Sequence, residues 1–464
     1  MYNPNLHFHF TGIGGSGMSG IAEILLNLGF KVSGSDLKIG PACEHLVSLG
    51  AVVSEGHAAD NLAPTTSLLV FSSAVSNDNP EVLEARRRGL PVVRRAEVLA
   101  ELMRLKYGVA VAGSHGKTTT TSLCAFILES AGFDPTVVIG GQVRSMASGG
   151  KLGRGDFLVA ESDESDRSFL LLKPTIAIIT NIDSEHLGAE GSLGELEDSF
   201  RQFIESVPFY GLAIMCSDDQ RVLKLAQSIS GRKLLYGLNS EAELQARAIH
   251  RLSSGVSFGI WKAGENLGEV TLPMFGMHNV SNALAAIAVA LELSVPFDVI
   301  CSSLSKFPGI KRRLEVAGVV NGVTLINDYG HHPTEIKATL EAVRAGWSSC
   351  KRVIVVFQPH RFTRTRDCFD QFLGAFEECD ELIVSDIYSA GEMPLVDIDG
   401  NRLCAAILHG CKRFLPNYEV ISEHLKSRLE PGDVVLFLGA GSIGAWPELF
   451  LQEQQSGESY ARSA

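Results

Sequence analysis

The residues with the clearest chemical potential form a glycine-rich loop with the sequence Gly-Ser-His-Gly-Lys-Thr-Thr. Glycines let backbone N–H groups converge on phosphate oxygens, a lysine neutralises charge and a threonine hydroxyl binds Mg²⁺. The general pattern begins two residues earlier, where this chain has Val111, so the loop is a shorter variant. The alternative is an ordinary turn between a strand and a helix. The predicted phosphate contacts are Gly113, Ser114, His115, Gly116, Lys117, Thr118 and Thr119.

A group of acidic residues is the best candidate for a metal site. Residues 157–160 predict a buried strand, and Glu161, Asp163, Glu164 and Asp166 follow it closely. Magnesium prefers carboxylate oxygens, and a triphosphate needs a metal ion held against its terminal phosphates. We therefore predict Glu161 as a metal ligand and expect most of the other acids to be solvated or to cap helices.

A histidine follows the next predicted strand, which covers residues 175–180. Polar groups at strand ends are where open α/β sheets bind ligands. This residue, His186, is either a second metal ligand or an ordinary polar residue at the end of a strand, and the residues alone favour neither interpretation.

A second glycine-rich loop, at residues 12–17, lies between a short apolar strand and a segment with apolar residues at helical spacing. It fits Gly-x-Gly-x-x-Gly, but the same turn binds dinucleotides or sugar nucleotides and also serves plain packing. Asp36 either accepts a hydrogen bond from a ligand hydroxyl or caps the next helix. We favour a nucleotide diphosphate here and infer no redox cofactor from this loop.

Two dense polar clusters follow predicted strands near the C-terminal end, at residues 328–334 and 358–365. Their arginines suit a carboxylate or a phosphate, because a guanidinium donates two parallel hydrogen bonds. The alternative is a pair of solvated surface loops. Zinc at His331 and His332 is disfavoured, because no third ligand stands at a suitable spacing in the sequence. We predict a ligand site.

Three α/β domains are needed to position these residues. Residues 1–105 predict a small, doubly wound Rossmann-like domain. Residues 106–312 predict a P-loop ATPase-like domain with a mixed sheet, in which residues 248–272 alternate like antiparallel strands. Residues 313–464 predict another Rossmann-like domain, with a polar tail after Leu451 that we expect to fray.

The composition is typical of a cytoplasmic globular protein. The chain has 464 residues, 45% of them hydrophobic and 20% charged, which suits several domains with separate cores. The formal net charge of -13 argues against nucleic acid as the main partner. The nine cysteines are scattered without a Cys-x-x-Cys pair, which predicts reduced, buried thiols. A signal-peptide pattern and long apolar stretches are absent from the sequence, so we expect no membrane partner.

Eight segments, taken together and in order, resemble the motifs of the Mur ligases. They are TGIGGSGMSGIAEILLNLG, GSHGKTTTTSL, AESDESDRSFL, TNIDSEH, GMHNVSNALAA, KRRLE, NDYGHHPTEIKATL and FQPHRFTRTRD. The resemblance covers nearly the whole chain and reaches all three domains, so it is far more specific than any one glycine loop. The segments look most like those of members that add L-alanine to UDP-N-acetylmuramate.

The resemblance implies an ADP-forming ligase of peptidoglycan precursor synthesis. The first domain would hold the UDP-sugar, the middle domain ATP and Mg²⁺, and the last domain would close over both with the amino acid. The lactyl carboxylate would take the γ-phosphoryl group of ATP, and the amine of L-alanine would then displace phosphate. We expect a cytoplasmic monomer or weak homodimer.

The resemblance also assigns candidate roles to single residues. The UDP-sugar would contact Gly12, Gly14, Gly15, Ser16, Gly17, Asp36, Ser72 and Ser73. Outside the phosphate loop, ATP would contact Asn279, Arg313 and Asp328, and the metal ligands would be Thr118, Glu161 and His186. The amino acid would contact His332, His360, Arg361 and Arg364. The catalytic candidates are Lys117, His332 and Arg313.

Other activities remain as alternatives. The nearest is a recycling ligase that attaches a ready-made peptide to the same sugar nucleotide, although FQPHRFTRT favours the alanine-adding members. A folate polyglutamate ligase would lack the separate first domain. A nicotinamide dehydrogenase would use residues 12–17 and Asp36, and a non-enzymatic ATP-driven switch would use residues 113–119, but neither needs all eight segments.

Overall fold

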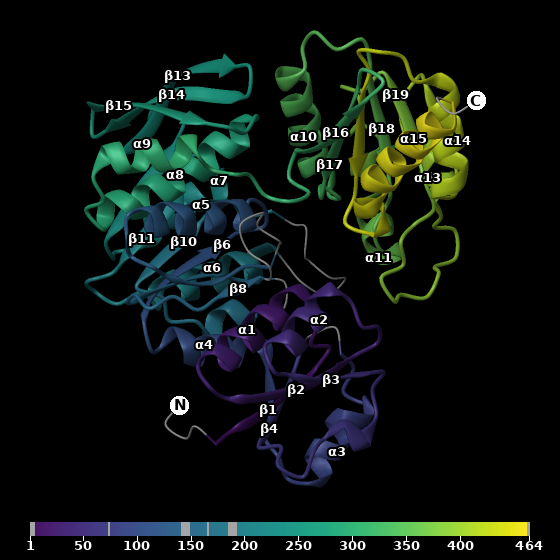
Figure 1. Ribbon diagram of the computed structural model, residues 1–464. Coiled ribbons are helices and arrows are strands. Elements are labelled where there is room, and N and C mark those ends of the chain that lie inside the picture. Colours follow the sequence, from purple (N-terminus) through teal and green to yellow (C-terminus); the bar gives the residue numbers. More distant parts are fainter. Residues whose placement is uncertain (1–4, 73–74, 141–148, 165–166, 184–192, 462–464) are drawn as a thin grey trace. The chain divides into compact units, whose positions relative to one another are not determined.

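The computed structural model describes residues 5–72, 75–140, 149–164, 167–183 and 193–461, and the chain forms two compact units (Figure 1). Unit 1 contains residues 1–250, 257–272 and 279–308, and unit 2 contains residues 251–256, 273–278 and 309–464. Both units are built from strands and helices in alternation, so the predicted α/β class is confirmed.

The first sheet of unit 1 has five parallel strands in the order β3-β2-β1-β4-β5. Its strands are β1 His7–Thr11, β2 Lys31–Asp36, β3 Val52–Glu55, β4 Leu68–Phe71 and β5 Val92–Arg94. The helical segments are α1 Ser16–Asn27, α2 Pro41–Ser48, η1 Ala59–Asn61, α3 Pro80–Arg87 and α4 Arg95–Met103. Because all five strands are parallel, the loops after β1, β2 and β3 lie along one edge.

The second sheet of unit 1 has ten strands in the order β15-β14-β13-β12-β11-β10-β6-β9-β7-β8. The strand β6 (Tyr107–Ala112) pairs in parallel with β9 (Phe157–Glu161) and β10 (Ile176–Ile179). The antiparallel pair of β7 (Thr136–Val138) and β8 (Gly150–Lys151) makes the sheet mixed, as predicted.

The remaining elements of this sheet complete the middle part of the chain. The strands are β11 Leu212–Cys216, β12 Lys233–Gly237, β13 Leu244–Leu252, β14 Gly255–Lys262 and β15 Glu265–Leu272. The helical segments are α5 Lys117–Ser130, η2 Ser168–Leu171, α6 Leu193–Glu205, α7 Gln220–Ser228, α8 Met277–Glu292 and α9 Phe297–Ser305.

Unit 2 contains a six-stranded sheet in the order β16-β17-β21-β18-β19-β20, which is parallel except for β16. The strands are β16 Glu315–Val320, β17 Val323–Asp328, β18 Val353–Phe357, β19 Glu381–Val384, β20 Lys412–Phe414 and β21 Val434–Leu438. The helical segments are α10 Pro333–Gly346, α11 Phe362–Asp367, α12 Phe369–Phe372, α13 Gly400–Ala406, α14 Tyr418–Arg428, η4 Ser442–Ala445 and α15 Trp446–Ala461.

Helices cover both faces of this sheet (Figure 1). Ile336 and Leu340 of α10 belong to one buried cluster, whereas Leu425 of α14 and Phe450 of α15 belong to another. Because helices bury both faces of the sheet, the sequences of its central strands are continuous apolar runs. None of the helices in the described ranges is long and apolar enough to cross a membrane.

Two sequence-based expectations are corrected by the structure. The segment after Leu451, which was expected to fray, continues the helix α15 to Ala461, and Glu453 within it accepts from the Ser422 hydroxyl at 2.7 Å and pairs with Lys426. The thiols are free but not all buried, since Cys301 and Cys350 are half-buried and Cys411 is exposed.

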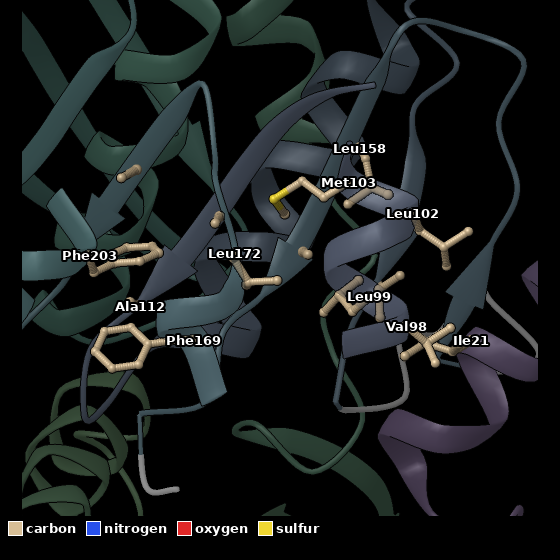
Figure 2. Packing of buried hydrophobic residues seen from close by; sticks show 14 of the residues in the cluster. Ile21, Val98, Leu99, Leu102, Met103, Ala112, Leu158, Phe169, Leu172 and Phe203 are labelled. Atoms are coloured by element: carbon tan, nitrogen blue, oxygen red, sulfur yellow. The ribbon is translucent and has the colours of Figure 1, made fainter. Parts of the chain in front are cut away.

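The helix α4 contributes one of the main apolar contacts inside unit 1. Val98, Leu99 and Leu102 of α4 are buried in one cluster that also contains Ile21 of α1 and Leu158 of β9 (Figure 2). The core of the first sheet is therefore continuous with that of the second, and burial of these side chains stabilises unit 1.

A close backbone contact accompanies this packing where α1 meets β8. A Cβ atom on Gly20 would lie 2.7 Å from the carbonyl O of Gly149 and 2.8 Å from the backbone N of Gly150. No side chain can occupy that space without moving the backbone, so the contact requires glycine.

We expect Gly20→Ala to lower the free energy of unfolding by roughly 1–3 kcal/mol, because the added methyl group forces α1 away from β8. On an exposed helix the same change would stabilise by about 0.5–1 kcal/mol, so the sign of the effect is diagnostic. Scanning calorimetry measures it. The control is Gly231→Ala, because its Cβ would lie 4.0 Å from the nearest atom. A Gly20→Ala protein as stable as the parent would contradict the packing.

Candidate functional site

The phosphate loop connects β6 to α5, and the adjacent strands β9 and β10 end beside it. Lys117 is the first residue of α5. The loop therefore combines a helix N-terminus with two flanking strand ends that carry polar side chains. A helix N-terminus attracts anions through its unpaired N–H groups and its dipole.

Residues after β10 brace this loop. The backbone N–H of His115 donates to Oδ1 of Asn181 at 2.8 Å, and the Thr180 hydroxyl donates to the His115 carbonyl at 2.6 Å. The N–H of Asp183 donates to the Ser114 hydroxyl at 2.8 Å. Sequence reasoning selected only His186 from this segment, although the polar run TNIDSEH was a signal for its other residues. His186 lies outside the described residues, as does Asp166.

The ammonium group of Lys117 is held at the mouth of the loop by three acceptors. Nζ donates to the carbonyls of Gly113 at 2.7 Å and Ser114 at 3.1 Å, and to Oε1 of Glu164 at 3.0 Å. Burial alone would lower the pKa of Lys117, but the carboxylates of Glu164 and Glu161 outweigh it and raise the pKa. The lysine is therefore a cation at neutral pH.

Glu164 was not singled out from the sequence, which predicted only that most of the acids other than Glu161 are solvated or cap helices. Its side chain is buried, and the attraction of the Lys117 ammonium, 3.0 Å away, opposes the cost of that burial. Burial raises the pKa of Glu164 to about 7, although Lys117 lowers it. The pair places a counter-charge directly beside the predicted phosphate site.

Thr118 and Glu161 lie together and provide oxygen ligands. The Thr118 hydroxyl donates to Oε2 of Glu161 at 3.0 Å, and the N–H of Gly140 donates to the same oxygen at 3.0 Å. A hydroxyl and a carboxylate beside a phosphate loop match the hard oxygen donors that Mg²⁺ prefers, so these residues fit the ion.

A residue missed by sequence reasoning connects the phosphate loop to α8. Gly116 has φ 80°, and a Cβ there would lie 2.4 Å from Oδ1 of Asn282. Asn282 also accepts a hydrogen bond from the Thr120 hydroxyl at 3.2 Å and donates to Oδ1 of Asn279 at 3.4 Å. The predicted nucleotide contact Asn279 is thus brought to the loop through Asn282.

The second glycine loop is fastened to the end of β2. The N–H groups of Gly12 and Ile13 donate to the carbonyl of Ser35 at 2.8 and 3.0 Å. The N–H of Gly14 donates to Oδ2 of Asp36 at 2.8 Å. Asp36 therefore shapes the loop from within, a role that neither sequence-based interpretation of this residue included.

The other predicted sugar contacts are placed as follows. Gly15 is the N-cap of α1, and Gly17 lies in the first turn of that helix. Ser72 directly follows β4 and is half-buried. The side chain of Ser16 and all of Ser73 lie outside the described part of the chain.

In unit 2 the predicted nucleotide contact Asp328 is buried and used internally. Its carboxylate accepts from the N–H of Leu314 at 2.7 Å, the N–H of Gly330 at 2.8 Å and the Thr339 hydroxyl at 3.1 Å. Burial raises the pKa of Asp328, while Arg313 and the two N–H groups lower it. The residue holds the start of β16 against the loop after β17.

Two neighbouring arginines stack over the same ring. The guanidinium carbons of Arg312 and Arg313 lie 4.8 and 5.2 Å from the ring centre of Tyr329. Arg313 also lies 3.8 Å from Oε1 of Glu335. Cation–π contacts of this kind orient a guanidinium, and Arg312 is held further by donating to the carbonyl of Gly439 at 2.6 Å. Arg312 was not selected from the sequence.

His332 caps the helix α10. Its Nδ1 accepts the N–H of Thr334 at 3.4 Å, and Glu335 completes a capping box by accepting the N–H of His332 at 3.4 Å. The side chain is buried. The position of this imidazole is therefore set by the start of the helix.

The remaining predicted amino-acid contacts gather after β18. Arg364 donates to Nδ1 of His360 at 3.1 Å, and the His360 ring stacks on Tyr388 with 5.6 Å between centres. The N–H of Arg361 donates to the Tyr388 carbonyl at 2.8 Å. Burial, together with His331 and the arginines, lowers the pKa of His360 to about 3, so this histidine is neutral and the cluster's charge lies on its arginines. Tyr388 was missed.

Comparisons with known proteins place the chain in one family. Three family models match successive parts: the Mur ligase family catalytic domain at residues 7–107, the Mur ligase middle domain at 111–290 and the Mur ligase glutamate ligase domain at 312–441. UDP-N-acetylmuramate--L-alanine ligase of Pelobacter propionicus is 51% identical over 96% of this chain and 97% of its own length. The enzyme of the same name from Geobacter sulfurreducens is 50% identical over 97% and 98%.

Solved structures agree. The UDP-N-acetylmuramate-alanine ligase of Thermotoga maritima is 27% identical, with a TM-score of 0.84 over 97% of this chain and 100% of that one. A murein peptide ligase of Psychrobacter arcticus is 25% identical, with a TM-score of 0.73 over 97% and 98%. Because three Mur ligase models match successive parts of the chain, and two relatives share about half of its residues over almost its full length, the chain belongs to the Mur ligase family.

Proposed function

We propose that this chain joins L-alanine to the lactyl carboxylate of UDP-N-acetylmuramate, with ATP converted to ADP and phosphate. The observation that carries the proposal is that the sequence is about 50% identical, over nearly its full length, to two enzymes named UDP-N-acetylmuramate--L-alanine ligase. The glycine-rich loop with Lys117 is present in this chain as well. The expected setting is the synthesis of peptidoglycan precursors.

An unactivated carboxylate is a poor acceptor for an amine, so the reaction needs an activating step. The carboxylate oxygen attacks the γ-phosphorus of ATP, and the bond from that phosphorus to the bridging oxygen of ADP breaks. The amine then attacks the acyl carbon, and phosphate leaves as the amine loses a proton. Charge that accumulates on the transferring phosphoryl group is offset mainly by positioned positive groups.

Lys117 and the N-terminus of α5 supply these positive groups in the middle domain. The lysine already lies within 3.1 Å of two loop carbonyls, so its position is set before the triphosphate binds, and one of its three present hydrogen bonds is exchanged for a bond to phosphate. Thr118 and Glu161 would hold Mg²⁺, which when bound would neutralise phosphate charge.

The arginines of unit 2 are proposed to bind the amino acid. Arg361 or Arg364 pairs with the carboxylate of alanine, because a guanidinium forms two parallel hydrogen bonds with such a group. His360 is neutral and accepts from Arg364, which orients that guanidinium. His332 steers the amino acid by donating from Nε2, because its Nδ1 accepts the helix-capping N–H and the proton of the neutral ring therefore lies on Nε2.

The competing assignment is a recycling ligase that takes a peptide in place of alanine. Among the solved structures the alanine ligase of Thermotoga maritima and the murein peptide ligase are 27% and 25% identical to this chain, with TM-scores of 0.84 and 0.73. The relatives that share about half of the residues carry the name of the alanine-adding enzyme. We expect phosphate release with UDP-N-acetylmuramate and L-alanine, and little with a tripeptide. A coupled phosphate assay with each acceptor tests this, and preference for the tripeptide would overturn the proposal.

Lys117→Ala is expected to abolish phosphate release while the protein stays folded, because the transferring phosphoryl group loses its main protein cation. Loss of such an electrostatic contact typically costs about 10²–10³-fold in kcat. The coupled assay measures the rate, and circular dichroism checks the fold. Turnover close to that of the parent would remove Lys117 from the mechanism.

Glu164→Gln should destabilise the nucleotide-free protein and increase its stabilisation by nucleotide. The change removes the carboxylate that accepts a hydrogen bond from the buried Lys117 ammonium and leaves Glu161 as the main negative group acting on it, which we expect to cost roughly 2–4 kcal/mol. Bound phosphates then supply the missing negative charge. Thermal unfolding with and without a non-hydrolysable ATP analogue measures both effects.

The matched control for this substitution is Glu129→Gln. Glu129 pairs with Lys151 at the surface, where an ion pair contributes about 0–1 kcal/mol. Equal shifts in the two variants would show that the Lys117–Glu164 pair has no special coupling to nucleotide.

A further inference from the structure

A buried carboxylate of the first domain takes no part in the sites described above. Glu81 is the second residue of α3, where its N–H donates to the capping side chain of Asn79 at 2.9 Å. Its own side chain is fully buried. A buried charge is costly unless several hydrogen bonds satisfy it, so the partners of this group indicate what it organises.

One carboxylate oxygen of Glu81 ties together the ends of two strands. Oε2 accepts from the Thr11 hydroxyl at 2.8 Å, the Ser35 hydroxyl at 2.7 Å and Nε2 of His9 at 3.3 Å. Thr11 is the last residue of β1, and Ser35 is the next to last of β2. Both strands therefore end on the same oxygen.

The other oxygen holds the segment that follows β3. Oε1 accepts from Nδ2 of Asn61 at 2.7 Å and from the N–H of Ala58 at 3.4 Å. The same amide of Asn61 donates to the carbonyl of Gly56 at 3.0 Å, which closes residues 56–61 into a compact turn. One carboxylate thus connects the ends of three neighbouring parallel strands.

The direction of these hydrogen bonds follows from the charge of Glu81. Burial alone would raise its pKa, but hydrogen bonds from His9, Asn61, Ser35 and Thr11 lower it to about 2, so the group only accepts. The single proton of Ser35 is then used on the carboxylate, and Oγ of Ser35 must accept from Nδ1 of His57, which lies 2.8 Å away. The carboxylate therefore also sets the orientation of the His57 ring.

These partners lead directly to the glycine loop. Gly12 follows Thr11 in the chain, and the N–H groups of Gly12 and Ile13 bind the carbonyl of Ser35. Asp36 follows Ser35 and accepts the N–H of Gly14. A shift at the end of β2 would consequently move the first turn of the loop.

We propose that Glu81 is a positioning residue for the UDP-sugar site. It acts through Thr11, Ser35 and Asn61, which set the geometry of the loop at residues 12–17 and of the turn at 56–61 for binding UDP-N-acetylmuramate. Glu81 itself does not touch the substrate. This inference rests on the proposed function, because it takes the first domain as the binding site of the sugar nucleotide.

The test is Glu81→Gln in the full-length enzyme. Glutamine keeps the volume but places an NH₂ donor where one carboxylate oxygen now accepts, so at least two of the donors above would face another donor. The KM for UDP-N-acetylmuramate should rise about tenfold or more, while the KM for ATP and for alanine stays within about twofold. Titration calorimetry with UDP-N-acetylmuramate should show the same loss of affinity.

Asp433→Asn is the matched control for a purely structural role. Asp433 is a buried carboxylate of unit 2 that accepts from Nε of Arg352 and from the N–H of Glu430, both within 3.0 Å. We expect this variant to lose thermal stability with its KM for the sugar nucleotide unchanged. If Glu81 had only a structural role, its variant would behave in the same way.

Asn61→Ala provides a milder second variant, because it removes only the bonds to Oε1 and to the Gly56 carbonyl. We expect about a threefold rise in the KM for the sugar nucleotide. This variant decides the question if Glu81→Gln does not fold. Unchanged KM values in the folded variants would overturn the inference, whereas a parent enzyme that neither binds nor converts UDP-N-acetylmuramate would overturn the proposed function instead.

Discussion

The parallel pairing of β6 with β9 and β10 is the constraint on which the site depends. It brings three carboxyl ends to one edge of the sheet, so that the phosphate loop, Glu161 and the residues after β10 become neighbours although they are far apart in sequence. The helix α5 begins at this edge and points its N-terminus toward the same place. Cations and N–H donors thereby collect where a triphosphate would lie.

Buried carboxylates then set the local geometry. Glu164 holds Lys117, Asp328 holds two backbone N–H groups, and Glu81 joins the ends of β1 and β2. Each carboxylate lies in a low-dielectric environment, where its charged form is costly unless hydrogen bonds or an opposite charge offset the loss of water, and where such interactions are correspondingly strong. Exposed pairs such as Glu129 with Lys151 impose much weaker constraints.

Some of these carboxylates were predicted from the sequence to contact a ligand directly, and others were not selected as site residues at all. Asp36 and Asp328 were selected as ligand contacts, and in the structure each receives hydrogen bonds from the protein's own backbone. Glu164 was passed over as a site residue and is buried against the lysine. A carboxylate at a strand end serves either purpose, and the choice depends on which N–H groups the adjacent loops bring within 3 Å.

The order of glycine, lysine and threonine beside apolar runs was enough to predict the turn between β6 and α5, the strand at residues 157–160 and the α/β class, because these depend on local geometry and periodicity. The partners of Lys117, the bracing by Asn181 and Asn282, and the network around Glu81 were decided only by the tertiary structure. Such contacts join residues separated by dozens of positions, and they exist only once sheet order has put particular strand ends side by side, which no local pattern encodes.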